Sequence, residues 1–298
     1  MERIRKSNSL ISPFFRRKVS AFLFLIPALV LFALFVWYPI FLGFIMAFQR
    51  IDVIGKPGVF VGLQNFKAIF TDAQFSSSLL AAAKFTGLTI LCYPIGIFMG
   101  IVINEFTGLK KFFRTTFYLP QLFPAVAIYA LWTYFFSMGN GAFNTLLKAF
   151  GIPAVPWLGN GSMVFISLQI MTMWMEVGGG ILLYSAAIEG INAELYEAAD
   201  IDGAGWWSKV WHITLPEMKV VIVIILLQTV IGKMQIFDMP YIMTGGGPNN
   251  ATTSPVMVIY NNAFKYLNFG PASAMSVILF LILIGVSIAY FVYNKKSD

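Results

Sequence analysis

The chain carries very little charge for its length. Only 11% of its 298 residues are Asp, Glu, Lys or Arg, and 58% are hydrophobic, whereas about 25% charged residues are usual in soluble globular domains. This composition excludes an ordinary soluble domain and indicates an integral membrane protein. The formal net charge of +7 does not indicate nucleic acid, because the basic residues stand at the ends of apolar runs and not on a polar face.

Cysteine and histidine are almost absent. Cys92 is the only cysteine, which excludes an internal disulfide framework, and its place within an apolar run favours a small core residue. His212 is the only histidine, so the sequence offers little support for a Ser-His-Asp triad or for a histidine-based metal site. A GxxxxGK[ST] phosphate-binding loop is also missing. We therefore expect no enzyme activity and no cofactor in this chain, and its energy must come from a partner or an ion gradient.

The chain contains several long apolar runs. A hydrocarbon core of about 30 Å needs about 20 apolar residues in a helix, and six stretches qualify, at about 19–48, 79–103, 115–137, 163–188, 220–243 and 272–293. They predict an all-α integral membrane protein with six transmembrane helices over residues 19–298, after an N-terminal tail at 1–18. The first run is too long for a signal peptide and lacks a cleavage site, so we expect it to be retained.

Lysine and arginine are distributed unequally between the two sides of these spans. Thirteen lie in the tails and in the connections after the second and fourth runs, and five lie in the other connections. The positive-inside rule therefore predicts that both termini and the connection at 189–219 are cytoplasmic. On the other side, residues 49–78 mix turn signals with amphipathic helix, 138–162 is rich in Gly, Asn and Pro, and Thr244–Pro255 is a turn-forming loop.

The connection at 189–219 contains two short amphipathic patterns around a glycine corner. Asn192 is a suitable N-cap for the first, in which Leu195, Ala198 and Ala199 share one helical face. Gly203 lies in a Gly-Ala-Gly run that predicts the end of this helix. The second pattern places Trp207, Val210 and Trp211 on one side, and Pro216 suits the first turn of the helix that follows.

The other face of the first pattern is acidic. Glu194, Glu197 and Asp200 recur every three residues, and Asp202 follows them. A helix lying on the inner membrane surface should be basic, because the cytoplasmic leaflet carries anionic lipid. A protein partner with basic residues is therefore favoured over the membrane surface.

The residues of this connection also carry a resemblance. Glu197–Ala199 reads EAA and Asp202–Ala204 reads DGA, and Ile213 and the pair Leu215-Pro216 follow. Together they resemble the signature loop of the membrane subunits of ATP-binding-cassette importers. With Tyr196 and the ITLP ending, the loop is similar to that of the sugar permeases of the carbohydrate uptake family, of which the maltose permeases are members. The sequence departs from that family at Val210, where an aromatic residue is common, and at Val220, where proline is frequent.

Further segments are similar to the same family over about 160–293. They are TGGGP, IYNNAF and GPASAMS in the second half, with a softer match in FYLPQLFPAVAI, Phe117 to Ile128. The resemblance implies a non-catalytic permease subunit in the cytoplasmic membrane of a bacterium or archaeon, surrounded by lipid. The implied partners are a second homologous permease, an ATPase dimer that binds ATP and Mg²⁺ on the cytoplasmic side, and an extracytoplasmic sugar-binding protein.

The resemblance also implies roles for individual residues. Glu197 and its helix would dock in a groove of the ATPase, whose closure would move the fourth and fifth spans and switch the cavity between inward and outward access. The implied coupling residues are Glu194, Tyr196, Glu197, Ala198, Ala199, Asp200, Asp202, Gly203 and Ala204. The family's sugar-contacting positions fall on Thr172, Trp174 beside them, Met175, Glu176 and Gly179, and on Thr229, Gly232, Lys233 and Ile236, although most of these differ in residue type.

Two ionisable residues lie near the middle of predicted spans, Glu176 in the fourth and Lys233 in the fifth. Charges at membrane depth usually face a cavity or a partner, and a pair would offset part of the cost of desolvation. We expect both to face the translocation path, and a purely structural ion pair between two helices is the alternative. The glycine run after Glu176, Gly178–Gly180, predicts a weakened helix and a close approach of backbone or ligand.

The chemistry of a sugar site adds further candidates. An aromatic face combined with amides or carboxylates is typical of such sites, and Trp174, Tyr184, Gln228 and Gln235 are of that kind. Lys233 raises the alternative of an acidic sugar such as a uronate, unless Glu176 neutralises the ammonium group.

Two other classes of function stay open at this point. An ion-coupled secondary transporter would use Glu176, Lys233 or Asp238 as the coupling site, but the inverted repeats that are typical of that class are not visible. A membrane scaffold or insertase would not need charges that face each other in mid-membrane. Dependence on ATP or on a proton gradient separates the two transport classes.

Overall fold

The structure is a computed structural model that describes residues 13–51, 58–106 and 108–295. Within these ranges the chain is an assembly of helices with one short antiparallel hairpin, in which β1 (Gln49–Arg50) pairs with β2 (Val59–Phe60). The predicted all-α character is therefore confirmed in substance. The tail predicted at 1–18 falls mostly outside the described residues.

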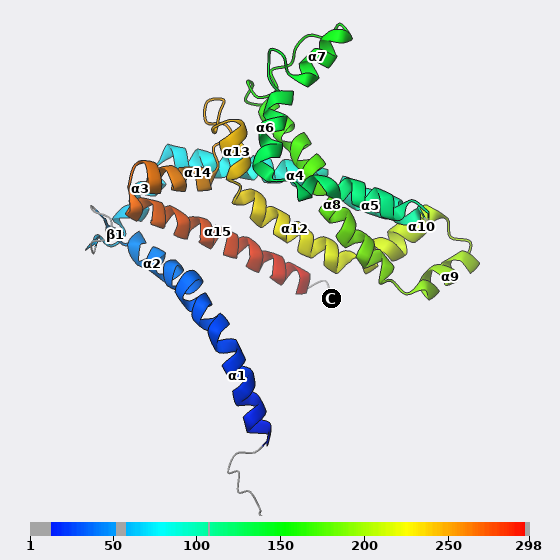
Figure 1. Ribbon diagram of the computed structural model, residues 1–298, viewed down its shortest axis with the longest axis horizontal. Helices are drawn as coiled ribbons and strands as arrows, with labels where there is room; N and C mark the ends of the chain where they lie inside the picture. The colour runs from blue at the N-terminus through cyan, green and yellow to red at the C-terminus, as the bar shows by residue number, and fades with distance from the viewer. Residues whose placement is uncertain (1–12, 52–57, 107, 296–298) are drawn as a thin grey trace, which may run out of the picture.

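The N-terminal helix leaves the rest of the molecule as a long rod (Figure 1). It consists of α1 (Pro13–Phe32), a π-helical turn (Ala33–Trp37) and α2 (Tyr38–Ala47). Its most apolar stretch, within Phe22–Ala47, is not buried against any other described part of the chain. Only the end of α2 packs on the body, where Phe44 meets Phe280 edge to face, with ring centroids 5.6 Å apart.

Four long helices form the body of the molecule. They are α4 (Ala73–Glu105), α8 (Met163–Glu189), α12 (Lys219–Met234) and α15 (Phe269–Lys295). α4 packs along α8, α12 packs against both, and α15 packs on α2 and on α3 (Gln64–Phe70). Gly100 allows α4 to pack closely on α8, because a Cβ at this position would lie 2.9 Å from the Cβ of Tyr184.

The helices predicted at 115–137 and 220–243 are each interrupted, and the prediction of one continuous helix there is wrong. The first consists of α5 (Lys110–Tyr118), a 3-10 turn (Leu119–Leu122) and α6 (Ala125–Phe135). Pro120 and Pro124 lie at this break, where proline has no N–H to continue a helix. The second stops at Met234, the end of α12, and resumes as α13 (Asp238–Met243).

Four helices of the described chain are long and apolar enough to cross a membrane, namely Phe22–Ala47, Ala73–Glu105, Met163–Glu189 and Phe269–Val292. A fifth is added if Trp206–Glu217 and Lys219–Met234, which are bent by 66°, count as one span. The four long helices agree with the first, second, fourth and sixth predicted runs. The count of six stays a prediction.

An aromatic cluster joins α6 to the segment that follows it. Trp132 of α6 and Phe136, which follows this helix, pack against Phe143 of α7 (Ala142–Ala149), with centroids 5.7 and 5.3 Å from the Phe143 ring. The buried Asn144 amide donates to the carbonyl of Val155 and accepts from the Val155 N–H and from Trp157 Nε1. The stretch 138–162 is therefore a packed element with its own helix, and not only a Gly-rich loop.

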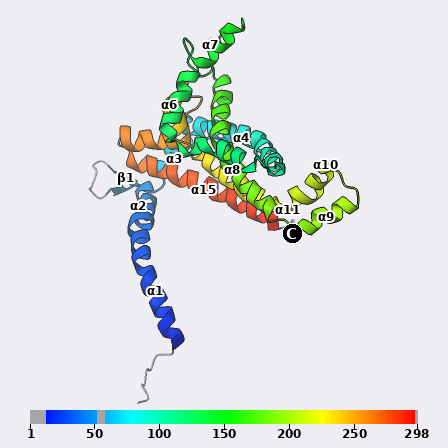
Figure 2. The same cartoon turned by 45° about the vertical axis from the view of Figure 1, so that its right-hand side comes forward.

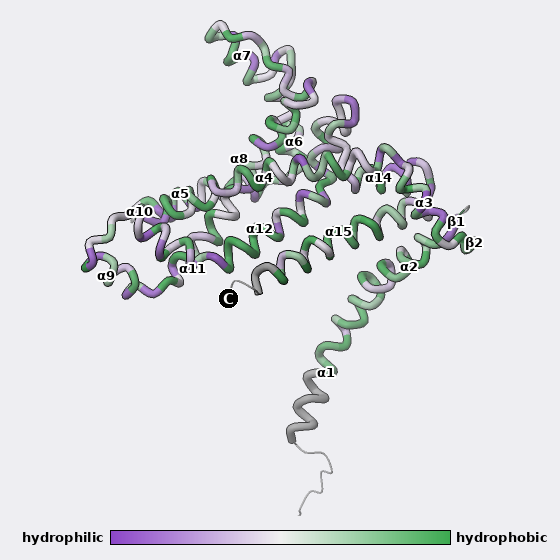
Figure 3. Tube along the Cα trace, turned by 180° about the vertical axis from the view of Figure 1, so that it is seen from behind, coloured by the Kyte–Doolittle hydropathy of each residue, from purple (hydrophilic) through white to green (hydrophobic). Residues whose placement is uncertain are grey.

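The loop predicted at Thr244–Pro255 is confirmed as irregular. Gly245, Gly246, Asn249 and Asn250 all have positive φ, and α14 (Pro255–Tyr260) begins where the loop ends. A π-helical turn (Asn261–Lys265) separates α14 from α15. Figure 3 shows this loop and the region of α9 with more polar colour than α1, α2 and α15.

Candidate functional site

The helix α9 (Ala193–Ile201) stands out from the body at the end of α8 (Figure 2). It begins as the sequence predicts, because the Asn192 side chain accepts a hydrogen bond of 3.1 Å from the N–H of Glu194. No residue of α9 is buried, and the Ile201 side chain is 87% exposed. Both the acidic and the apolar face of this helix are therefore at least partly exposed within the described chain.

The corner after α9 depends on Gly203. Its φ is +74°, in the left-handed region that favours glycine. The N–H of Ala204 donates to the carbonyl of Ala199 at 2.9 Å, and the N–H of Gly203 donates to that of Asp200 at 3.1 Å. These two bonds form a Schellman motif, so the predicted glycine stop is confirmed.

The second half of this connection returns to the body. It consists of α10 (Trp206–Lys209), a π-helical turn (Val210–Thr214) and α11 (Leu215–Glu217), in whose first turn Pro216 lies as expected. Val210 is buried, whereas Trp207 and Trp211 are 58% and 62% exposed. The three residues expected on one side of this pattern therefore differ in burial, and a π-helical turn begins at Val210.

Polar contacts fix the connection to the ends of the long helices. Trp206 Nε1 donates to Glu105 of α4 at 3.2 Å, and Lys209 forms an ion pair with Asp200. Glu189, the last residue of α8, pairs with Lys110 at 2.6 Å and with Arg114 at 2.9 Å. These contacts join the connection to the end of α4 and the end of α8 to α5.

The residues predicted for coupling lie together on this projecting unit. Glu194, Glu197, Ala198, Asp200, Asp202 and Gly203 are exposed, and Tyr196, Ala199 and Ala204 are half-buried. The Tyr196 hydroxyl is 2.9 Å from Thr214 Oγ1, which ties α9 to the turn before α11. Their role in coupling stays a prediction.

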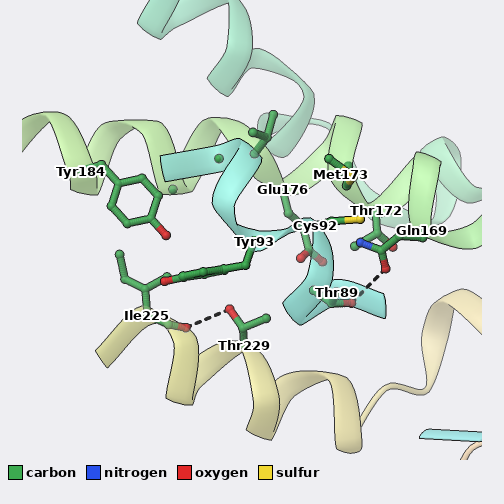
Figure 4. Close-up of a pocket in the computed structure, with 13 residues that line it drawn as sticks. Thr89, Cys92, Tyr93, Gln169, Thr172, Met173, Glu176, Tyr184, Ile225 and Thr229 are labelled. Atoms are coloured by element: carbon green, nitrogen blue, oxygen red, sulfur yellow. Dashed lines mark hydrogen bonds between the residues drawn. The ribbon is translucent and has the colours of Figure 1, made fainter. Parts of the chain in front are cut away.

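A cavity of about 120 Å³ lies between α4, α8 and α12 (Figure 4). Its described lining consists of Thr89, Cys92, Tyr93 and Gly96 from α4, of Gln169, Thr172, Met173, Glu176, Val177, Gly180 and Tyr184 from α8, and of Ile225 and Thr229 from α12. The cavity therefore combines hydroxyls, an amide, a carboxylate and two tyrosine rings with apolar walls.

Hydrogen bonds hold several of these polar groups in place. Thr89 Oγ1 donates to Gln169 Oε1 at 2.9 Å and so connects α4 with α8, as Figure 4 shows. The Tyr93 hydroxyl donates to the carbonyl of Ile222 at 2.7 Å and connects α4 with α12. The rings of Tyr93 and Tyr184 meet edge to face at 6.3 Å. The wall of the cavity is thus formed by three helices that are bonded to one another.

Glu176 and Lys233 form the ion pair that their positions suggest. Lys233 Nζ lies 2.6 Å from Oε1 and 2.7 Å from Oε2 of Glu176. The lysine side chain is 7% exposed and the glutamate side chain 49%. Glu176 lines the cavity, whereas Lys233 is absent from its described lining and has its Nζ 5.8 Å from the centroid of the Phe85 ring.

The other residues predicted for the substrate path divide into two groups. Thr172 and Thr229 line the cavity with Glu176. Trp174 packs on Trp132 instead, with ring centroids 5.5 Å apart, and Met175 and Ile236 pack against the hydrophobic core cluster that contains Trp132. Gly232 faces open space and Gly179 lies against the Gln121 side chain. For these five residues the structure places the side chain or backbone outside the described lining, as it does for Gln228 and Gln235.

The glycine run has a structural explanation. A Cβ at Gly178 would lie 2.0 Å from the carbonyl oxygen of Phe117 and 2.7 Å from the Cα of Tyr118. The predicted close approach of backbone is therefore confirmed, and it joins α8 to α5. The expected weakening is not seen, because α8 continues as an α-helix through Gly178–Gly180.

The contribution of α4 was not recognised from the sequence. Thr89, Cys92 and Tyr93 line the cavity, and Thr86, Thr89, Tyr93, Gly96 and Gly100 recur at spacings of three and four residues. This spacing puts them on one face of a helix. The stripe of small and polar residues within an apolar run is the signal that could have identified the face turned toward α8.

Comparisons with known proteins agree with this arrangement. Residues 92–297 match the family described as "Binding-protein-dependent transport system inner membrane component". The probable ABC transporter permease protein YurN of Bacillus subtilis (strain 168) is 32% identical over 287 residues, which are 95% of this chain and 98% of that protein. The sulfoquinovosyl glycerol transport system permease protein SmoG of Agrobacterium fabrum is 30% identical over 286 residues, with 94% and 92% covered.

A solved structure shares the fold. The crystal structure of a bacterial ABC transporter involved in the import of the acidic polysaccharide alginate contains a chain that superposes with a TM-score of 0.84. Its sequence identity is 24%, and the match covers 94% of this chain and 96% of that one. The family match and the identity to these relatives show that this chain belongs to the binding-protein-dependent transport system inner membrane component family.

Proposed function

We propose that this chain is the permease subunit of an ATP-driven importer of sugars or oligosaccharides that receives its substrate from an extracytoplasmic binding protein. The observation that carries the proposal is the course of α8, which lines the cavity and leads through Gly190–Asn192 into the exposed α9. The carbohydrate assignment is supported by the ligands named for the similar proteins, sulfoquinovosyl glycerol and the acidic polysaccharide alginate.

The chain itself performs no bond chemistry in this proposal. The acidic and exposed α9 docks in a groove of a cytoplasmic ATPase dimer, which binds ATP and Mg²⁺. α8 and α12 flank the cavity and are joined by the connection at 189–219. A rigid displacement of α9 therefore changes the spacing of the two helices and alternates the access to the cavity.

A second homologous permease completes the translocation path. The cavity of about 120 Å³ is smaller than the 300–1,000 Å³ that is typical of sites enclosing a drug-sized ligand. The described apolar side chains of the α1–α2 rod are also largely exposed within this chain. Both features are consistent with a partner subunit that supplies the opposite wall and with lipid around the rod.

The proposed topology has six spans and cytoplasmic termini in a bacterial or archaeal cytoplasmic membrane. The third span is then the broken α5–α6 unit, and the fifth begins with α12. Irregular backbone at membrane depth is tolerated where protein covers it or where it lines a cavity. Gln121 of the first break fits this rule, because its Nε2 donates to the carbonyl of Glu176 at 3.4 Å.

The test is purification of the chain in mild detergent from its native membrane, with the co-purifying proteins identified and ATPase activity measured. We expect a second permease and an ATPase with the wild-type chain. Glu197→Lys should lose the ATPase, because it reverses the charge on the exposed face of α9. Glu217→Lys is the matched control, since Glu217 is also exposed but lies in α11.

The outcome also decides between the two transport classes. An ATPase that is retained with Glu197→Lys contradicts the docking surface. Uptake that is abolished by a protonophore and insensitive to ATP depletion contradicts the importer and favours ion coupling through Glu176 or Asp238.

A further inference from the structure

Only one member of the Glu176–Lys233 ion pair lines the cavity between α4, α8 and α12. Among the described residues that line the cavity, Glu176 is the only one that carries a charge. Lys233 is absent from this lining, and its side chain is 7% exposed against 49% for Glu176. A substrate in the cavity therefore meets the carboxylate first and the ammonium group only behind it.

The positive charge of Lys233 is stabilised by the groups around it. Its Nζ is 2.6 and 2.7 Å from the two carboxylate oxygens, so both oxygens of Glu176 are engaged. The Phe85 ring lies 5.8 Å from the same Nζ, within the range of a cation–π contact. An anionic ligand would have to displace Glu176 to reach Lys233, and a buried charge whose partner is removed is strongly unfavourable.

The remaining polar groups suit hydroxyl-rich ligands. Thr172 and Thr229 offer hydroxyl groups, Gln169 an amide, and Tyr184 an aromatic ring on the same lining. Both oxygens of Glu176 contact Lys233, but a carboxylate has about four acceptor sites and no donor. Glu176 can therefore still accept from a ligand hydroxyl, whereas a second carboxylate has no hydrogen to donate to it.

We propose that the cavity selects uncharged sugars and rejects uronates, with Glu176 as the specificity-determining residue and Lys233 as the buried cation that positions it. The inference rests on the proposed function, since it names the class of sugar for the same site. It reverses the alternative that Lys233 holds an acidic sugar, and it sets this chain apart from the importer of acidic alginate whose fold it shares.

Cys92 provides a direct probe of this charge. It is the only cysteine of the chain, it is half-buried and it lines the cavity. In the complete complex in native membranes, the rates of modification by a cationic and an anionic methanethiosulfonate of similar size are compared. The modified Cys92 peptide is quantified by mass spectrometry, with Cys92→Ser as the check of assignment.

The expected result follows from the exposed carboxylate. A cleft with one sign of charge raises the local concentration of the opposite ion by about tenfold or more, so the wild type should react faster with the cationic reagent. Glu176→Gln should reverse the preference by about the same factor, because it leaves the ammonium of Lys233 unpaired. Glu217→Gln removes a carboxylate outside the cavity and should leave the ratio unchanged.

Two outcomes overturn the inference. One is a wild-type preference for the anionic reagent, and the other is a Glu176→Gln ratio equal to the wild-type ratio. If Glu176→Gln does not assemble, the double variant Glu176→Gln/Lys233→Gln removes both charges, and its cation-to-anion ratio must fall below that of the wild type for the inference to stand.

Uptake separates this inference from the proposed function. With the same binding protein throughout, wild-type vesicles should take up neutral oligosaccharides and not uronate oligosaccharides of equal length, and Glu176→Gln should raise the relative uptake of the uronate. Equal or greater uptake of the uronate by the wild type refutes the selection of neutral sugars. If ATP drives the uptake of neither sugar, the proposed function fails, while the Cys92 ratio still decides the charge of the cavity.

Discussion

At the scale of single residues, the most demanding position is Gly178. A Cβ there would overlap the backbone of Phe117 and Tyr118, and backbone cannot move aside as a flexible side chain does. Gly178→Ala should therefore force α5 and α8 apart, and overpacking of this kind costs about 1–3 kcal/mol. We expect a lower midpoint of thermal unfolding in detergent and a lower yield of the assembled complex.

The matched control is Gly232→Ala on α12. No atom lies within 4 Å of a Cβ at that position, and alanine favours a helix over glycine by about 1 kcal/mol. Its thermal midpoint should equal or exceed that of the wild type. Equal midpoints for the Gly178 and Gly232 variants would contradict the close contact of α5 with α8.

The sequence identified the residues whose burial is costly and missed those whose role depends on a neighbour. Glu176 and Lys233 could be paired in advance because two opposite charges in apolar runs need each other. Thr89 and Tyr93 could not be assigned with equal ease, because a threonine or tyrosine within a span is not costly on its own. Trp174 looked like a sugar-stacking ring, but its contact with Trp132 became visible only with α6 in place.

At the scale of elements, the corner between α9 and α10 makes a graded prediction. Gly203 has φ +74°, where a residue with a Cβ pays about 1–2 kcal/mol, and asparagine is among the side chains that tolerate this region best. Coupling of ATP hydrolysis to uptake should therefore decrease in the order Gly203, Gly203→Asn, Gly203→Ala and Gly203→Val. The measurement is binding-protein-stimulated ATPase activity and sugar uptake in the same proteoliposomes.

Gly205 provides the control for that series. It lies two residues further along the same corner, with φ −69° and open space around a Cβ. Gly205→Ala should therefore retain both activities. A Gly205→Ala variant as defective as Gly203→Ala would show that the whole corner tolerates no side chain, and would contradict a specific role for the left-handed residue.

Helices were predictable where hydropathy alone determines them. α8 ends within one residue of the predicted 163–188, and α15 covers the predicted 272–293. The breaks at Leu119–Pro124 and Gln235–Phe237 were missed because apolar residues on both sides keep the mean hydropathy high. Hydropathy measures the tendency to enter lipid, whereas a break depends on the loss of backbone hydrogen bonds at proline and on tertiary packing that covers the freed groups.

At the scale of the whole molecule, the rod of α1 and α2 is the part that the rest of the chain covers least. It diverges from the body in Figures 1 and 2, and among its described residues only Ala47 is buried. Lipid can cover such a surface, but the contact of α2 with α15 fixes where the rod leaves the bundle. The sequence predicted that this helix crosses the membrane, but its direction depends on the contact of α2 with α15, which hydropathy does not reveal.

The orientation of the whole molecule gives the last prediction. Lysine and arginine favour the side that holds both tails and the connection at 189–219, so Ser208 should be cytoplasmic and Ser76, in the first turn of α4, should lie outside. Both serines are exposed. On a Cys92→Ser background, Ser76→Cys and Ser208→Cys make the same small chemical change on opposite sides. A membrane-impermeant thiol reagent should modify Cys at 76 in right-side-out vesicles and Cys at 208 only after permeabilisation. The reverse pattern would place α9 outside, where no ATPase can reach it, and would refute the coupling mechanism together with the topology.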